Sequence, residues 1–235
     1  MSKNLFITGT GTDVGKTFVA ALIVKKLNDD GKKAAYYKAA MSGNERNADG
    51  NLIPGDALYV KTVSGIDQPL EQMCPYVYEQ AVSPHLASRM EGNPVRLERV
   101  VQDFKSVCKT QDYVTMEGSG GILCPLCTEG TPLQLEDVIR ELNLGCLLVA
   151  TAGLGAINAV GLTAEYMRAH KIPLRGIIFN HFHPGNLLEE DNKRMCEEMT
   201  GQKVLACVQD GDTELNLQAA LLESLYEESE GGSLE

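Results

Sequence analysis

Gly9-Thr10-Gly11-Thr12-Asp13-Val14-Gly15-Lys16-Thr17 is the stretch of sequence that decides the fold. It follows a short apolar run, Leu5 to Thr8, and precedes residues 17–28, whose apolar side chains predict a buried helix ended by Gly31. A strand, a glycine loop and a helix in this order bring backbone N–H groups and the positive end of a helix dipole together. This arrangement predicts a phosphate-binding site.

The loop has the composition of a P-loop with variant spacing. In a P-loop, the lysine reaches the β- and γ-phosphates and the following hydroxyl ligates Mg²⁺, roles that Lys16 and Thr17 would take here. The common pattern has four residues between its first glycine and Gly-Lys-Thr, whereas five follow Gly9 and three follow Gly11. We therefore expect a nucleotide-binding loop of a variant class.

Apolar runs of strand length alternate with segments of helical spacing along the rest of the chain. Predicted strands lie at 34–38, 113–117, 146–150, 176–180 and 203–208, and predicted helices at 97–109, 134–142, 156–170, 187–199 and 213–225. Glycine and proline break residues 39–96 into a loop-rich insertion with short helices near 56–63 and 84–90. The alternation predicts an α/β fold: a mostly parallel central sheet flanked by helices on both faces, P-loop NTPase-like and a single domain. The domain is expected over 1–226, followed by an acidic flexible tail at 227–235.

The composition narrows the class of partner. A formal net charge of −11 disfavours nucleic acid and anionic membranes, because both attract basic surfaces. No apolar stretch approaches the ~18 residues that a membrane helix needs, and no signal peptide is evident, so a cytoplasmic protein is expected. The seven cysteines are expected to be reduced thiols. Cys124 and Cys127 have metal-like spacing, but without a second pair of ligands they are interpreted as buried core residues.

Three more charged residues stand at positions typical of a ligand site. Lys38 ends a predicted strand, Glu117 ends another and leads into Gly118-Ser119-Gly120-Gly121, and Asp56 follows Pro54-Gly55. Asp56 and Glu117 could hold the Mg²⁺ beside Thr17. Taken alone, Lys38 could be an ordinary strand-end lysine and Asp56 a helix cap.

Several aromatic and imidazole side chains are given lesser roles. Tyr36 and Tyr37 are expected to pack in the core or against a loop. His181 and His183 lack a third metal ligand, so they are interpreted as surface residues or residues at the edge of a nucleotide site.

Taken together, these segments resemble the dethiobiotin synthetases, and the resemblance spans nearly the whole chain. It rests on the variant loop, on Lys-x-x-x-Ser-Gly at 38–43, on Asp56 and on Glu-Gly-x-Gly-Gly at 117–121. Further matches are Pro75-Tyr76 with Ser83-Pro84-His85, Leu154-Gly155-Ala156-Ile157-Asn158 with Leu162-Thr163, and Asn180.

The resemblance implies an ATP- and Mg²⁺-dependent cyclo-ligase. It would form the ureido ring of dethiobiotin from 7,8-diaminopelargonate and CO₂ through a carbamate and a carbamic–phosphoric anhydride. The family is also expected to be homodimeric, with the substrate near the subunit interface.

The resemblance also assigns roles to residues. The implied catalytic residues are Thr12, Lys16 and Lys38, and the implied substrate-binding residues are Thr12, Ser42, Gly118 and Asn158. The implied metal ligands are Thr17, Asp56 and Glu117. The implied nucleotide-binding residues are Asp13, Val14, Gly15, Lys16, Thr17, Phe18, Asp56, Glu117, Gly118, Ser119, Gly120, Asn180, His181, Val208, Gln209 and Asp210.

One segment departs from the family pattern. Where relatives carry Gly-x-Ile-Pro along the nucleotide base, this chain has Ala206-Cys207-Val208-Gln209-Asp210, so the sequence leaves the choice between ATP and other triphosphates open. Relatives also carry Thr or Ser where this chain has Cys124 and Cys127.

Two rival functions remain at this point. An amidoligase with a glutaminase domain is disfavoured because the chain is too short to hold that domain. A nucleotide-dependent switch or partitioning-type P-loop ATPase is the alternative. Such proteins usually carry an early lysine in the loop, whereas residues 9–12 contain none.

Overall fold

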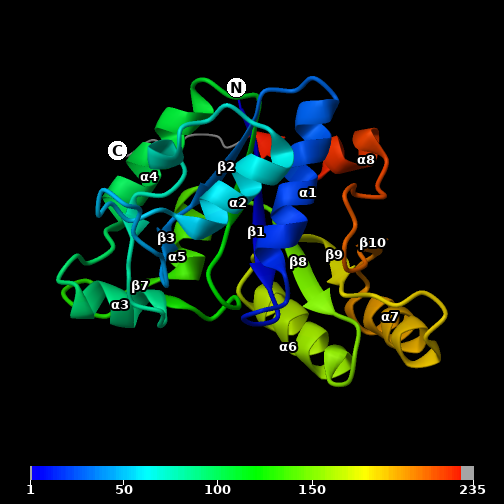
Figure 1. Cartoon of the computed structure of the whole chain (residues 1–235). Helices are drawn as coiled ribbons and strands as arrows, with labels where there is room; N and C mark the ends of the chain where they lie inside the picture. The colour runs from blue at the N-terminus through cyan, green and yellow to red at the C-terminus, as the bar shows by residue number, and fades with distance from the viewer. Residues whose placement is uncertain (1, 229–235) are drawn as a thin grey trace.

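Seven strands form the central sheet of the computed structural model, which describes residues 2–228 (Figure 1). The strands are β1 (Lys3–Gly9), β2 (Ala34–Lys38), β5 (Tyr113–Glu117), β8 (Cys146–Thr151), β9 (Leu174–Asn180), β10 (Val204–Cys207) and β11 (Glu227–Glu228). Their order is β10-β9-β8-β1-β5-β2, and each of these neighbouring pairs is parallel. The carboxyl ends of the six strands therefore lie along one edge of the sheet.

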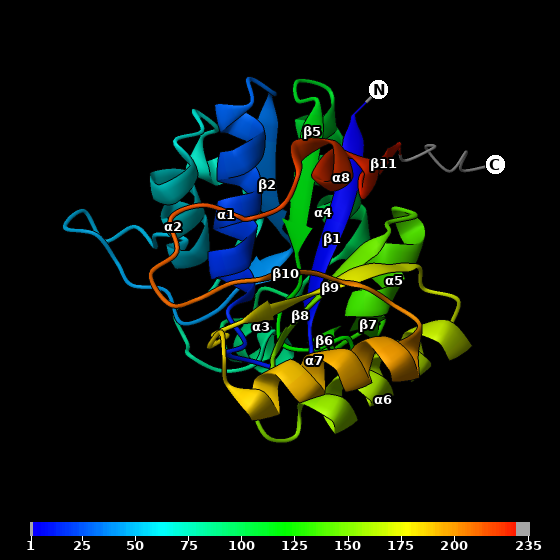
Figure 2. The ribbon, with the colours of Figure 1, turned by 90° about the vertical axis from the view of Figure 1, so that its right-hand side faces the viewer.

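Helices cover both faces of this sheet (Figure 2). They are α1 (Lys16–Asp29), α2 (Gly55–Ser64), α3 (Pro84–Met90), α4 (Leu97–Cys108), α5 (Leu135–Glu141), α6 (Ala156–Ala169), α7 (Leu187–Thr200) and α8 (Ala219–Ser224). One buried cluster joins α1, α2 and α8 to the sheet, and two others join α4, α5, α6 and α7 to the opposite face. The predicted fold class is confirmed.

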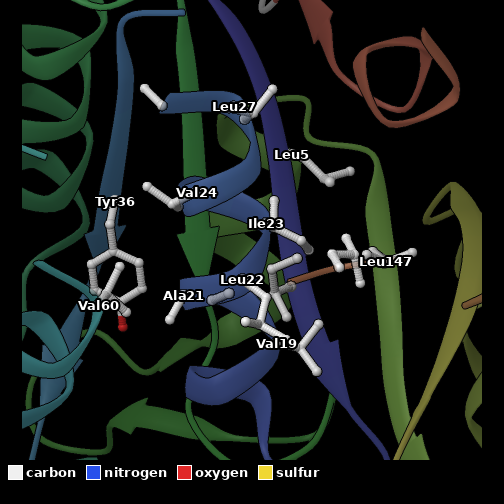
Figure 3. Packing of buried hydrophobic residues seen from close by; sticks show 14 of the residues in the cluster. Leu5, Val19, Ala21, Leu22, Ile23, Val24, Leu27, Tyr36, Val60 and Leu147 are labelled. Atoms are coloured by element: carbon white, nitrogen blue, oxygen red, sulfur yellow. The ribbon is translucent and has the colours of Figure 1, made fainter. Parts of the chain in front are cut away.

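Strand alternation explains how one sheet serves two cores. Leu5 and Ile7 of β1 lie in the α1 cluster, whereas Phe6 between them lies in the cluster of α4 and α5. Helix α1 is apolar almost all round and packs across the middle of the sheet, where Ile23 lies near Leu5 (Figure 3). The helix that follows the phosphate-binding loop is therefore anchored at the centre of the fold.

The insertion between β2 and α4 contains more regular structure than predicted. Besides α2 and α3, it includes the 3₁₀ turn Leu70–Gln72 and the two-stranded sheet of β3 (Ala40–Met41) and β4 (Tyr76–Val77). A second small sheet pairs β6 (Pro125–Cys127) with β7 (Leu133–Gln134). A backbone hydrogen bond of 2.8 Å from Lys38 N to Met73 O ties the insertion to the end of β2.

Two predictions near the C-terminus were wrong in detail. The helix predicted over 213–225 begins only at Ala219. Leu215 and Leu217 are buried, but the segment that carries them is not helical. Their apolar character reflects packing against the α1 cluster and not helical periodicity. The expected tail at 227–235 begins with strand β11, which pairs antiparallel with Lys3 and Asn4, and residues 229–235 lie outside the described residues.

Across residues 2–228, no helix is both long and apolar enough to cross a bilayer. All seven cysteines are free thiols, as the sequence predicted.

The packing of α1 generates a stability prediction. Replacing the fully buried Ile23 by alanine should lower the free energy of unfolding by about 3 kcal/mol, because the substitution removes buried methyl groups and leaves a cavity. Leu187→Ala is the control, since Leu187 is 85% exposed and should change the value by less than about 0.5 kcal/mol. Denaturant titration of both variants measures the difference, and equal losses would contradict this account of the core.

Candidate functional site

The carboxylate of Glu117 is the hub of a hydrogen-bonded cluster at the carboxyl edge of the sheet. Its Oε1 accepts hydrogen bonds from Thr17 Oγ1 at 2.9 Å and from Lys38 Nζ at 2.6 Å. Its Oε2 accepts one from Tyr36 Oη at 2.7 Å. Glu117 is only 1% exposed, so these partners offset the cost of burying its charge.

Parallel register brings the cluster together. Lys38 ends β2 and pairs with Glu117, which ends β5, while Ile7 of β1 pairs with Glu117 on its other side. Neighbouring residues in register point to the same face of a sheet, and this face is the one covered by α1. Thr17, in the first turn of α1, therefore reaches Glu117 from the face of the sheet that α1 covers.

Asp56 enters the cluster from the insertion. Its Oδ2 accepts a hydrogen bond of 2.7 Å from Lys38 Nζ, and its side chain is 41% exposed. Helix α2 is held in place by Asn44, whose Oδ1 accepts a hydrogen bond of 2.9 Å from Gly55 N. The N-cap residue of α2 is Pro54. Asp56 therefore does not have the alternative role of helix cap that its sequence position allowed.

The glycine loop turns sharply into α1. Asp13 and Gly15 both have positive φ angles, 60° and 83°, and α1 begins at Lys16. The ammonium group of Lys16 donates a hydrogen bond of 2.8 Å to Gly11 O, across the loop. Lys16 is buried, and its ammonium group lies within the loop, whose backbone precedes the N-terminus of α1.

The two lysines differ in their electrostatic environment. Burial lowers the pKa of Lys16 below its ordinary value and nearby Lys38 adds to this effect, while Glu117 and Asp56 oppose it. Burial also acts to lower the pKa of Lys38, but the two carboxylates outweigh it and raise that pKa above its ordinary value. Lys38 is therefore firmly cationic and shared between two carboxylates, whereas the hydrogen bond of Lys16 goes to a neutral carbonyl.

A second group of residues lies beside Gly15. Asn180, the last residue of β9, donates from Nδ2 to Val14 O at 3.2 Å, and its Oδ1 is buried without a hydrogen-bond partner among the described residues. A Cβ atom added to Gly15 would lie 1.9 Å from Asn180 Nδ2, so only glycine allows this close approach.

The segment after β10 completes this side of the site. Backbone hydrogen bonds fix Val208 to Phe179 and Phe182, and the ring of His181 contacts the Asp210 carboxylate. Gln209 N donates to Asp212 Oδ2 at 2.9 Å. The segment that departs from the family pattern thus lies next to Asn180 and His181, where the sequence expected a nucleotide base.

The residues expected to hold substrate are less tightly connected. Thr12 and Asp13 are exposed on the loop, and a Cβ added to Gly120 would lie 3.8 Å from Thr12 Oγ1. Ser42 donates to Val82 O at 2.6 Å. Asn158 is exposed in the first turn of α6, and no contact among residues 2–228 joins it to the Glu117 cluster.

The second glycine loop, Gly118-Ser119-Gly120-Gly121, packs against the first, residues 9–17. Gly118 N donates to Ile7 O at 2.9 Å and Ser119 Oγ donates to Ala40 O at 3.1 Å. A Cβ added to Gly118 would lie 2.9 Å from Leu135 and Phe6. Phe18, also expected at the nucleotide, is partly buried against the α1 cluster.

The oxygen donors of the cluster suit a magnesium ion. Asp56 and Glu117 supply two carboxylates that contact Lys38 Nζ, and Thr17 supplies a hydroxyl that contacts Glu117. Mg²⁺ prefers such hard oxygen ligands completed by phosphate oxygens and water. Within the described part of the chain, no group of three or more His, Cys, Asp or Glu side chains could hold a metal ion. Cys124 and Cys127 are buried free thiols, consistent with their interpretation as core residues.

Tyr36 also belongs to this cluster, although its sequence predicted only a packing role. Its ring lies in the α1 cluster as expected, but its hydroxyl reaches Glu117. Strand alternation could have indicated this direction, because Tyr36 is two residues before Lys38 and shares its face.

Comparison with known proteins identifies close relatives in sequence. A family model described as an AAA domain matches residues 3–213. An ATP-dependent dethiobiotin synthetase of Brachyspira hyodysenteriae is 43% identical over 228 residues, which cover 97% of this chain and 100% of that protein. An ATP-dependent dethiobiotin synthetase of Clostridium botulinum is 43% identical over 209 residues, which cover 89% of this chain and 92% of that protein.

Solved structures resemble the chain in fold alone. The MinC:MinD cell division protein complex of Aquifex aeolicus matches with a TM-score of 0.54 at 13% identity, covering 89% of this chain and 82% of that chain. The signal recognition particle receptor FtsY of Elizabethkingia anophelis matches with a TM-score of 0.53 at 13% identity, covering 96% of this chain and 65% of that chain.

The contact between Gly15 and Asn180 generates a binding prediction. Gly15→Ala should weaken ATP binding by at least about tenfold, because the added methyl group collides with Asn180 and alanine is strained at a φ of 83°. Gly153→Ala is the control, since its added Cβ would meet nothing within 4 Å. Isothermal titration with ATP tests both variants, and equal affinities would show that this close approach does not shape the nucleotide site.

Proposed function

Because the chain belongs to the family of ATP-dependent dethiobiotin synthetases, we propose that it closes the ureido ring of dethiobiotin from 7,8-diaminopelargonate, CO₂ and ATP. It is an ATP-dependent cyclo-ligase of biotin biosynthesis. The observation that carries the detailed proposal is the convergence of Lys16, Lys38, Asp56 and Glu117 at one edge of the sheet.

The proposed reaction has three balanced steps. One amine of the substrate adds to CO₂ and loses a proton, which gives a carbamate. A carbamate oxygen then attacks the γ-phosphorus of ATP, so that a new O–P bond forms as the bond to the ADP oxygen breaks. Finally, the neighbouring amine attacks the carbamate carbon and loses a proton, and inorganic phosphate leaves as the second C–N bond closes the ring.

The site chemistry supports this proposal because the second step brings two anions into contact. The carbamate and the γ-phosphate repel each other, and fixed positive charge lowers that repulsion without reorganising solvent. In the proposal, Lys16 contacts the β- and γ-phosphates and Lys38 lies between the γ-phosphate and the carbamate. The amides of Asp13 to Thr17 hold the triphosphate at the N-terminus of α1.

Thr17, Asp56 and Glu117 are the proposed ligands of Mg²⁺. A bound magnesium ion would neutralise charge on the β- and γ-phosphate oxygens. The assignment is supported by two contacts: Thr17 Oγ1 donates to Glu117, and Lys38 Nζ links Glu117 to Asp56. The Asp56 side chain is more exposed than that of Glu117 and would be free to turn from Lys38 toward the ion.

The substrate and nucleotide contacts are proposed from the surrounding loops. Thr12, Ser42 and Gly118 would bind the carbamate and the diamine between the two glycine loops. Gly120 and Ser119 would lie against the phosphates, and Asn180 with His181 and residues 208–210 would face the base. The free Oδ1 of Asn180 is an acceptor suited to an exocyclic amino group such as that of adenine.

A homodimer in the cytoplasm completes the proposal. Leu154 and Leu162 lie beside and within α6 and are 91% and 64% exposed, which favours an apolar contact with a second subunit. Asn158 lies between them in sequence and would reach the substrate carboxylate across that contact. Seven free thiols fit a reducing compartment.

The proposed activity has a direct test. Purified protein incubated with 7,8-diaminopelargonate, bicarbonate, Mg²⁺ and ATP should yield dethiobiotin by mass spectrometry, with one ADP per product. Chelation of the metal by EDTA should abolish the product, and excess Mg²⁺ should restore it. Substrate-independent ATP hydrolysis without dethiobiotin would instead support a nucleotide-dependent switch.

Lys38 should matter more for turnover than for binding. Lys38→Ala removes a cation proposed to act on the transferring phosphoryl group, so kcat should fall by about 100-fold or more, while the Kd for ATP changes by less than about fivefold. Steady-state kinetics and isothermal titration measure the two effects, with circular dichroism to confirm folding. Unchanged turnover in a folded variant would remove Lys38 from the mechanism.

A further inference from the structure

The hydroxyl of Tyr36 holds the oxygen of Glu117 that faces away from the reaction site. Of the two carboxylate oxygens, Oε1 is shared by Thr17 and Lys38, while Tyr36 Oη donates to Oε2 at 2.7 Å. Because Tyr36 is fully buried, water does not compete for this hydrogen bond.

The geometry explains why a partner on Oε2 matters. The terminal torsion of a glutamate side chain is broad, so two partners on one oxygen do not fix the plane of the carboxylate. A donor on the second oxygen restricts rotation about that torsion. The direction of the Oε1 lone pairs, which accept from Lys38 and Thr17 and would face a bound metal ion, then depends on the tyrosine.

Tyr36 is itself rigidly placed. Its backbone N–H donates to Gln68 Oε1 at 2.9 Å, and its ring lies in the buried cluster that also contains Val60 of α2 (Figure 3). The strand that carries Tyr36 also carries Lys38, and its register with β5 places Tyr36 two positions before Glu117. The donor, the carboxylate and the lysine therefore share one rigid pair of strands.

We propose that Tyr36 is a positioning residue for this reaction, which orients the Glu117 carboxylate for Lys38 and for the divalent ion. The proposal builds on the proposed ligase function. Tyr36 touches neither substrate nor nucleotide in this account, and it acts only through Glu117.

The chain supplies a matched control on the same strand. Tyr37 is also fully buried and its hydroxyl also donates one hydrogen bond, of 2.9 Å, but to Val100 O of α4 on the opposite face of the sheet. Tyr36→Phe and Tyr37→Phe each remove one hydroxyl and the single hydrogen bond that it donates. A purely structural role would give the two variants similar properties.

The test compares both variants in three measurements. The first is kcat and KM for dethiobiotin formation. The second is the affinity for Mn²⁺ in the presence of ADP and without diamine, measured by electron paramagnetic resonance. The third is the midpoint of thermal unfolding, and all assays are run well below the lower midpoint.

Tyr36→Phe should lower kcat by about tenfold and weaken Mn²⁺ binding by about tenfold, the effect expected from losing one hydrogen bond to a charged group. At saturating Mg²⁺, KM for ATP should stay within about twofold, because Lys16 and the loop amides that hold the phosphates are unchanged. Tyr37→Phe should leave kcat and Mn²⁺ affinity within about twofold of the parent. It should lower the midpoint of thermal unfolding no more than Tyr36→Phe does, because its lost hydrogen bond goes to a neutral carbonyl.

Two results would overturn the proposal: kcat and Mn²⁺ affinity unchanged in Tyr36→Phe, or equal losses in both variants. The Mn²⁺ measurement also separates this proposal from the proposed function. If the parent protein makes no dethiobiotin but Tyr36→Phe alone weakens Mn²⁺ binding, the ligase assignment fails and the positioning role stands. If the parent is active and Tyr36→Phe resembles it in both measurements, only the positioning role fails.

Discussion

A single buried carboxylate, that of Glu117, sets the constraint on which the rest of the site depends. An anion that is 1% exposed requires partners, and this one has a lysine and a tyrosine from β2 and a threonine from α1. Each partner reaches Glu117 only because β1, β2 and β5 are parallel and end at the same edge. The charged cluster therefore forms when these strands pair.

The charge arrangement fits the chemistry proposed for it. Lys38 is held by two carboxylates that maintain its positive charge, whereas burial lowers the pKa of Lys16, whose ammonium group donates to a neutral carbonyl. A triphosphate and a carbamate need such fixed cations at one point, since solvent cannot supply them in a partly buried site. A similar fold occurs in proteins as different as a cell division protein complex and a signal recognition particle receptor, so the function resides in these side chains and not in the fold.

Much of the fold could be predicted because it is written in local patterns. The alternation of apolar runs and helical segments gave the correct class, and glycine with lysine after the first strand placed α1 and its loop correctly. The prediction failed where burial was mistaken for periodicity, as at Leu215 and Leu217, and where pairing involves too few residues to leave a pattern, as in β3 and β11. Short strands depend on distant partners, and no local signal encodes a distant partner.

By itself, the sequence determined which chemical groups this protein has available: a variant phosphate loop, two lysines at its site, and two carboxylates next to glycine or proline. Only the tertiary structure decided how they meet. It placed Lys38 between Asp56 and Glu117, brought Asn180 against Gly15, and turned the hydroxyl of Tyr36 toward Glu117 while that of Tyr37 faces α4. The physical reason is that residue type is a property of the chain, whereas contact between residues far apart in sequence depends on strand register and on the face to which each side chain points.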